Sequence, residues 1–212
     1  AEAESNHLDT VKFLVKLGAN VNARTDTGWS AMKWAMICRN HDMIRILREA
    51  GDKGYTDLSL AAFRGDLKEV RRLLAAGVPV DERNPADNST PLIMACLGGG
   101  PALVRFLLQQ GADPNAKDMN NWTPLMNAIH TNSVRIAEML LDAGADVNAR
   151  DVHGASALDS AVFFGHADVV RFLISRGADM TRRNHEGQTL KQVARDRGQI
   201  AVFKALDLAG AP

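Results

Sequence analysis

One glycine recurs along the chain at nearly constant spacing, each time directly after a leucine-rich stretch. It stands at Gly18, Gly51, Gly77, Gly111, Gly144, Gly177 and Gly210, with successive spacings of 33, 26, 34, 33, 33 and 33 residues. The residues after it are nearly copied, as in GANVNAR from Gly18 and GADVNAR from Gly144. A fixed period of this size is the signature of a solenoid in which each repeat is one supersecondary unit. The 212 residues are therefore predicted to form an elongated stack with nearest-neighbour contacts rather than one central core.

Each period also contains a Ser or Thr that precedes an apolar run, as in Thr123-Pro124-Leu125. The hydroxyl can accept a free N–H of the first helical turn, and Pro fits that turn, so a short helix is predicted over 123–130. A turn follows, and then a second helix with apolar residues at helical spacing, such as Ile136, Leu140 and Leu141. The recurring glycine should end this second helix in a left-handed conformation. The Asp- and Asn-rich stretch after it indicates a turn or hairpin.

Helix, turn, helix and hairpin every 33 residues resembles the ankyrin repeat, and the resemblance covers essentially the whole chain. It implies an all-α ankyrin-repeat solenoid of helix-turn-helix units joined by β-hairpin loops, elongated and curved. The expected copies are a partial one at 1–24, then 25–51, 52–83, 84–117, 118–150, 151–183 and a C-terminal cap at 184–212. The His that usually follows Thr-Pro-Leu in the family is absent from every copy, which weakens single repeats but not the assignment.

The spacing between Gly51 and Gly77 is seven residues short, and the alignment places the gap directly after Gly51. The finger that would join these copies should be largely missing. Two alternatives follow: a bend or hinge at the irregular junction 50–57, or a trimmed loop with unchanged helix stacking. A second irregularity is the run Gly98-Gly99-Gly100-Pro101, which indicates a loosened turn because a phosphate loop would need a preceding strand and a GxxxxGK[ST] pattern.

Charge and cysteine usage exclude several classes of protein. Twenty-five basic residues balance twenty-five acidic ones, so no global field would attract a nucleic acid or a membrane surface. No apolar stretch approaches the roughly 18 residues that a membrane span needs. Cys38 and Cys96 lie two repeats apart, too far for a disulfide. Free thiols favour a reducing compartment such as the cytoplasm, although the sequence does not fix the location.

Catalysis, a cofactor and a metal site are not expected. The six histidines belong to different copies, and none shares a metal-ligand spacing such as HxxxH. Ser156, Asp159 and His166 suggest a catalytic triad only superficially, because Ser156 is the repeated helix-start residue and no GxSxG elbow is present. The carboxylates Asp146 and Asp151 occupy repeated turn positions rather than forming a pair of acid and base.

The resemblance implies a concave face, lined by hairpins and first helices, on which ankyrin domains mostly bind proteins. The candidate partner-binding residues occupy its exposed positions: Trp29, Tyr55, Phe63, Arg64, Met119, Asn120, Trp122, His130, Val152, His153, Phe163 and Phe164. Exposed aromatic residues and Met mark binding surfaces because they bury much area at low entropic cost. The alternative is that these aromatic side chains only pack on a neighbouring repeat. That alternative is favoured for Trp34, which is expected to be half-buried.

The sequence thus predicts a non-catalytic protein-binding module, monomeric by itself, with a protein partner and without nucleic acid or membrane. Alternatives are an inhibitor or immunity-type protein that blocks an enzyme, the targeting arm of a larger enzyme truncated upstream, and a structural role in a homo-oligomer. Residues 107–169 carry three basic and eight acidic side chains, whereas 170–212 carry eight basic and four acidic ones. This asymmetry could orient a charged partner, but solvated helix faces explain it equally well.

Overall fold

The computed structural model describes residues 2–25, 30–98, 100–184 and 186–212, with side chains from Leu8 onward. Its thirteen helices within these ranges are α1 (Glu2–Lys16), α2 (Ala31–Ile37), α3 (His41–Glu49), α4 (Asp57–Arg64), α5 (Leu67–Ala75), α6 (Pro91–Gly98), α7 (Pro101–Gln109), α8 (Pro124–His130), α9 (Val134–Asp142), α10 (Ala157–Phe164), α11 (Ala167–Ser175), α12 (Leu190–Asp196) and α13 (Ile200–Leu208). Trp29 and Gly99, both singled out in the sequence, lie outside the described residues. One helix therefore precedes six helix pairs.

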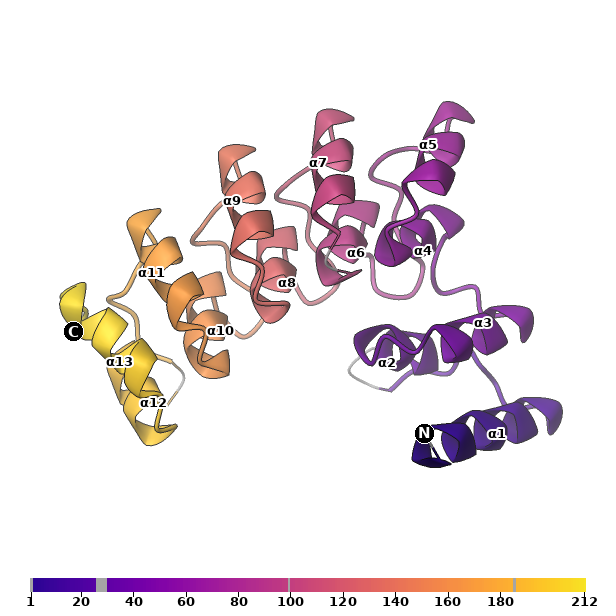
Figure 1. Cartoon of the computed structure of the whole chain (residues 1–212), viewed down its shortest axis with the longest axis horizontal. Coiled ribbons are helices and arrows are strands. Elements are labelled where there is room, and N and C mark those ends of the chain that lie inside the picture. Colours follow the sequence, from indigo (N-terminus) through magenta and orange to yellow (C-terminus); the bar gives the residue numbers. More distant parts are fainter. Residues whose placement is uncertain (1, 26–29, 99, 185) are drawn as a thin grey trace.

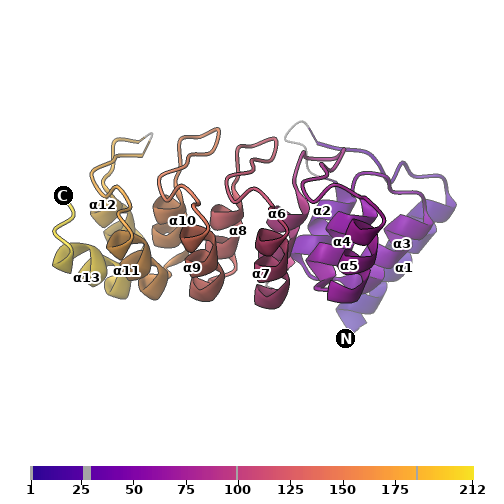
Figure 2. The same cartoon turned by 90° about the horizontal axis from the view of Figure 1, so that it is seen from above.

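The helix pairs stack side by side into an arch (Figure 1). From α4 onward, the first helix of each pair lies on the inner, concave side and the second helix on the outer side. The loops between pairs, which we call fingers, project from one side of the stack (Figure 2). The predicted all-α solenoid is confirmed, and within the described residues β-pairing is limited to isolated bridges between Arg24 and Ser30 and between Arg183 and Thr189.

The predicted helix boundaries are confirmed at the atomic level. The side chains of Ser30, Thr56, Thr123, Ser156 and Thr189 each accept the backbone N–H three residues later and so cap the first helices. This bond satisfies one of the N–H groups that a helix start leaves free. The seven recurring glycines have φ between +72° and +92°, the left-handed region that ends a helix.

Asparagine side chains join the fingers that contain Asn115 and Asn148 to the next finger along the stack. The Asn115 amide donates to Gly144 O at 2.9 Å, and its oxygen accepts the N–H of Asp146 at 2.7 Å. Asn148 makes the same two bonds with Gly177 and Asp179. Because these bonds satisfy backbone groups at finger bases, they hold neighbouring fingers in a fixed register.

The stack changes direction at the shortened junction. Figure 1 shows α1, α2 and α3 running across the direction of the later helices. The main neighbour of α4 is α6, whereas α2 packs chiefly on α3. The junction itself is held by Arg48, which donates to Asp52 O at 2.9 Å and to Tyr55 O at 3.2 Å and pairs with Asp57. Whether this bend also acts as a hinge stays a prediction.

The finger at 84–90 occupies the place of the missing one. The N–H of Ala86 donates to Gly54 O at 2.8 Å, and Arg24 donates to the carbonyls of Pro85 and Ala86. Lys33 Nζ of α2 lies 3.0 Å from Asp87 Oδ2. The second copy therefore contacts a finger two repeats further along the chain, which a regular stack of nearest neighbours would not allow.

Candidate functional site

Two of the predicted binding residues are buried, so the expectation that they are exposed was wrong. Tyr55 is 2% exposed and Phe63 4% exposed. Tyr55 turns inward because its hydroxyl donates to Oδ2 of Asp87, which belongs to the 84–90 finger, at 2.9 Å. The Phe63 ring lies 6.5 Å from that of His41 on α3, and α6 approaches the backbone at Phe63 so closely that a Cβ on Gly98 would lie 2.1 Å from Phe63 O. Both side chains stabilise the junction instead of a free surface.

Four other predicted residues lie at finger tips. The exposed fraction is 47% for Met119 and 53% for Val152, and His153 is exposed while Asn120 is half-buried. Backbone bonds connect successive tips: Met119 N–H donates to Asp87 O at 2.8 Å, and Val152 N–H to Asn120 O at 3.0 Å. The tips therefore form one continuous row whose backbone positions are fixed.

A second group lies at the ends of the first helices, and we call it the aromatic patch: Trp122, His130, Phe163, Phe164, His166 and Arg197. The Phe163 and Phe164 rings meet edge-on at 5.3 Å between centroids, and Phe164 lies 5.1 Å from His130. Phe164 also stacks on His166 at 5.8 Å. The exposed fraction is 49% for Phe163 and 41% for Phe164. Three neighbouring repeats, through α8, α10 and α12, thus contribute to one surface on the concave side (Figure 1).

Trp122 forms the edge of the aromatic patch and is half-buried. Its ring lies 6.3 Å from that of His130, and its indole N–H donates to Asp151 Oδ2 in the next finger at 3.2 Å. Its apolar body packs on the core. Trp122 therefore packs against the neighbouring repeat and stays partly exposed to solvent, and its role in binding stays a prediction.

Each histidine of the aromatic patch is half-buried and has one ring nitrogen shielded from water. His130 Nδ1 and His166 Nε2 are buried without a hydrogen-bond partner in the described part of the chain. Burial lowers the pKa of His166, and the nearby His130 lowers it further. A neutral His166 is thereby favoured at neutral pH, which suits its stacking on an apolar ring.

Three residues escaped the sequence reasoning. His166 and Arg197 belong to the aromatic patch. The repeat gave a signal for Arg197, because it follows Phe164 by 33 residues, which is one period. Trp34, expected to be half-buried, is 55% exposed. The stack turns after α3, so no neighbouring first helix packs broadly along α2 to cover this ring.

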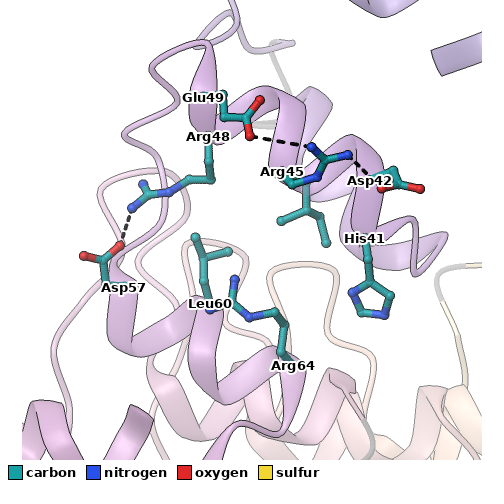
Figure 3. A pocket seen from close by; sticks show the side chains of 9 residues that line it. His41, Asp42, Arg45, Arg48, Glu49, Asp57, Leu60 and Arg64 are labelled. Atoms are coloured by element: carbon teal, nitrogen blue, oxygen red, sulfur yellow. Dashed lines mark hydrogen bonds and ion pairs between the residues drawn. The ribbon is translucent and has the colours of Figure 1, made fainter. Parts of the chain in front are cut away.

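Arg64 lies apart from both groups, in a cavity of about 450 Å³ in the elbow between α3 and α4. Figure 3 shows Arg45, Arg48 and Glu49 on one wall and Asp57, Leu60 and Arg64 on the other. The charges largely pair within the cavity: Arg45 with Asp42 and Glu49, and Arg48 with Asp57. The lining holds three arginines and three carboxylates, so its charge favours no class of ligand.

Metal-binding clusters of three or more His, Cys, Asp or Glu side chains are absent from the described residues. Among the helices described, none is both long and apolar enough to cross a membrane. Cys38 is exposed and Cys96 buried, and both are free thiols.

Several known proteins are similar in sequence to parts of this chain. A family model described as ankyrin repeats in three copies matches residues 58–151 and 119–184, and one described as ankyrin repeats in many copies matches residues 1–48. An ankyrin repeat-containing protein of Saccharomyces cerevisiae is 43% identical over 61 residues, which are 29% of this chain and 12% of that protein. An L-asparaginase of Dirofilaria immitis is 30% identical over 119 residues, covering 53% of this chain and 20% of that protein. Protein PhlB of Serratia liquefaciens is 32% identical over 102 residues, 45% of each. The matched segments thus span less than half the length of each of these relatives.

Proposed function

Because the chain belongs to the ankyrin repeat family, we propose that it is a non-catalytic module that binds a protein partner on the concave face of its arch. Ankyrin repeats are generally protein–protein interaction modules. The proposal for this chain rests on one observation: large apolar side chains stay exposed along the finger tips and in the aromatic patch.

These side chains have the character of binding hot spots. Phe163 and Phe164 expose roughly half their surface, and aromatic residues are enriched among the few that dominate binding energy. The positions of the rings are fixed by their mutual edge-on contact and by the neighbouring imidazoles. Binding to such a preorganised surface loses little conformational entropy.

The deciding experiment compares partner capture by the wild-type chain and by a Phe163→Ser/Phe164→Ser double variant. Captured proteins are quantified by mass spectrometry, and the affinity of each purified candidate is then measured by titration. We expect the double variant to weaken binding at least about tenfold, the scale expected when a hot spot is removed. This double variant should keep the helical circular dichroism of the wild type.

A matched control removes two exposed apolar side chains elsewhere. Ile200 is 70% exposed and Leu208 89% exposed on α13, a second helix. The Ile200→Ser/Leu208→Ser variant should retain wild-type binding. Equal loss of binding in both double variants would show that general surface hydrophobicity, not the concave face, captures the partner, and the proposal would fail.

A second candidate is that this repeat array serves as the binding arm of a larger protein. The specific observation is that the matched segments cover small parts of the relatives, one of which is named an L-asparaginase. An immunoblot of the native protein tests this. A band near 23.0 kDa would count against it, and a much larger band would support it.

A further inference from the structure

The aromatic patch carries a cation that has no carboxylate partner. The Arg197 guanidinium lies over the Phe163 ring at 3.8 Å from its centroid. Its contact with the ring holds the planar group in place but uses none of its N–H donors. Within the described residues, no ion pair engages Arg197.

The acidic groups nearby are already engaged within the chain. Asp196 accepts a hydrogen bond from Gln188 at 2.9 Å, and Asp207 pairs with Lys191 at 2.9 Å. Asp159 is held in the capping box of α10, where it accepts from the backbone of Ser156. The residues from 170 to 212 carry eight basic and four acidic side chains. This side of the aromatic patch therefore offers donors for an incoming anion.

The opposite side of the aromatic patch has another character. There the Trp122 indole N–H donates to the carboxylate of Asp151. Phe163 and Phe164 form the apolar centre between the two sides, with roughly half of each ring accessible. A ligand that complements the whole patch must place an apolar group at the centre and negative charge only toward α12.

We propose that the aromatic patch binds an extended protein segment whose apolar side chain covers Phe163 and Phe164 and whose adjacent carboxylate pairs with Arg197. This inference rests on the proposed function and names the chemistry of the partner. Arginine presents a planar fork that matches carboxylate geometry. A single-stranded nucleic acid also combines bases with negative charge, but its continuous backbone would approach the Asp151 carboxylate beside Trp122.

The test uses synthetic fluorescent peptides and anisotropy titration against the full chain. The first peptide has a Leu-Phe-Leu centre followed by Asp-Asp-Glu, the second replaces the acids by Asn-Asn-Gln, and the third replaces the apolar centre by Ser-Ser-Ser. We expect the first peptide to bind at least about tenfold more tightly than either of the others, because both elements are needed. Its affinity should fall as salt increases from 50 to 300 mM, since the carboxylate contacts are solvent-exposed.

Variants of the chain locate the peptide. Phe164→Ala should weaken the first peptide about tenfold, and Arg197→Gln should weaken it several-fold and flatten its salt dependence. Arg176→Gln is the matched control, because Arg176 stands over Phe172 at 5.2 Å and follows α11 on the outer side of the stack, where it pairs with Asp142. This control should bind like the wild type. Since Arg197 is exposed, its variant is expected to fold, and circular dichroism verifies this.

Each other outcome overturns the inference. Equal affinity for the acidic and amide peptides, or equal effects of Arg197→Gln and Arg176→Gln, would show that carboxylates are not recognised. Tighter binding of an oligothymidine than of the first peptide would assign the patch to nucleic acid instead. If natural partners depend on Phe163 and Phe164 but not on Arg197 or salt, the proposed function stands and this inference fails.

Discussion

At the scale of single residues, the buried Asp87 carboxylate replaces contacts that a complete finger would make. It accepts from Tyr55 at 2.9 Å, from Lys33 at 3.0 Å and from the Ser89 hydroxyl at 2.6 Å, and it is 3% exposed. Burial alone would raise its pKa, but the Lys33 ammonium and the hydrogen bonds outweigh this and hold the pKa below its usual value. Asp118 lies farther from the same cation, 3.9 Å from Lys33, and there burial prevails and raises the pKa.

The lowered pKa of Asp87 predicts how stability depends on pH. A carboxyl whose folded pKa lies below its unfolded value of about 3.9 stabilises the fold above that pH, and this contribution is lost as pH falls through the folded pKa. Asp87→Asn should therefore lower the free energy of unfolding by about 1–3 kcal/mol near pH 7, because buried donors lose their acceptor. The difference from the wild type should shrink as pH falls below about 4. Urea unfolding at pH 7, 5, 4 and 3 measures it.

A matched control is Asp168→Asn, because Asp168 pairs with Arg171 on the surface, with 81% of its own side chain exposed. Such pairs contribute about 0–1 kcal/mol, so this variant should resemble the wild type at neutral pH. A deficit of Asp87→Asn that stays constant down to pH 3 would contradict the assigned shift.

At the scale of elements, the packing of α4 on α6 is tighter than the repeat alone requires. Gly98 ends α6 against the backbone of Phe63, where a Cβ would lie 2.1 Å from the carbonyl oxygen. Small residues on the facing helix, Ala61 and Ala62, are fully buried. This close approach explains the glycine at position 98 without a ligand.

Gly98→Ala should consequently destabilise the protein. Backbone atoms cannot rotate away as a flexible side chain would, so the helices must separate, at a cost of about 1–3 kcal/mol or more. Gly100→Ala is the control, because a Cβ there would meet its nearest neighbour, the Cβ of Leu103, at an ordinary 3.7 Å. Thermal unfolding followed by circular dichroism compares them. Equal melting temperatures for the two variants would show that the close approach is relaxed in solution.

At the scale of the whole molecule, the change of direction divides the stack into α1–α3 and α4–α13 (Figure 1). Repeat proteins are stabilised mainly by interfaces between neighbouring repeats. The two parts of the stack can therefore unfold separately where that interface is altered. Arg48 spans this interface through two backbone carbonyls and Asp57. The rest of the joint consists of the contacts that the 84–90 finger makes with Gly54, Lys33 and Arg24.

Arg48→Ala should loosen the first three helices selectively. Losing hydrogen bonds from a charged donor costs about 1–3 kcal/mol, and hydrogen exchange should accelerate in α2 and α3 while α8–α11 keep their protection. Arg45→Ala serves as the control, because Arg45 lies on the same helix, 64% exposed, and makes only surface ion pairs. A uniform acceleration over all helices would mean that the stack unfolds as one unit.

The candidate site was predictable in part. The period placed Phe163, Phe164 and His130 at first-helix ends, and the structure brings them together because equivalent positions in neighbouring repeats stack. The period could not reveal that the side chains of Tyr55 and Phe63 turn inward. Tyr55 is held by Asp87, which lies 32 positions later in the chain, and Phe63 packs where the stack bends, between His41 of the preceding repeat and α6 of the following one.

The sequence by itself determined the repeat, the helix pairs, their caps and the curved stack, because each of these follows from local capping, periodicity and nearest-neighbour packing. Only the tertiary structure decided the direction of the chain after Gly51. Without a finger after Gly51, no local sequence signal sets the direction of the next helices. Contacts between residues far apart in the chain set it instead. The ion pair between Lys33 and Asp87 is one such contact and joins residues 54 positions apart. Its carboxylate comes from a finger two copies further along the chain, because the shortened junction has no finger to supply one.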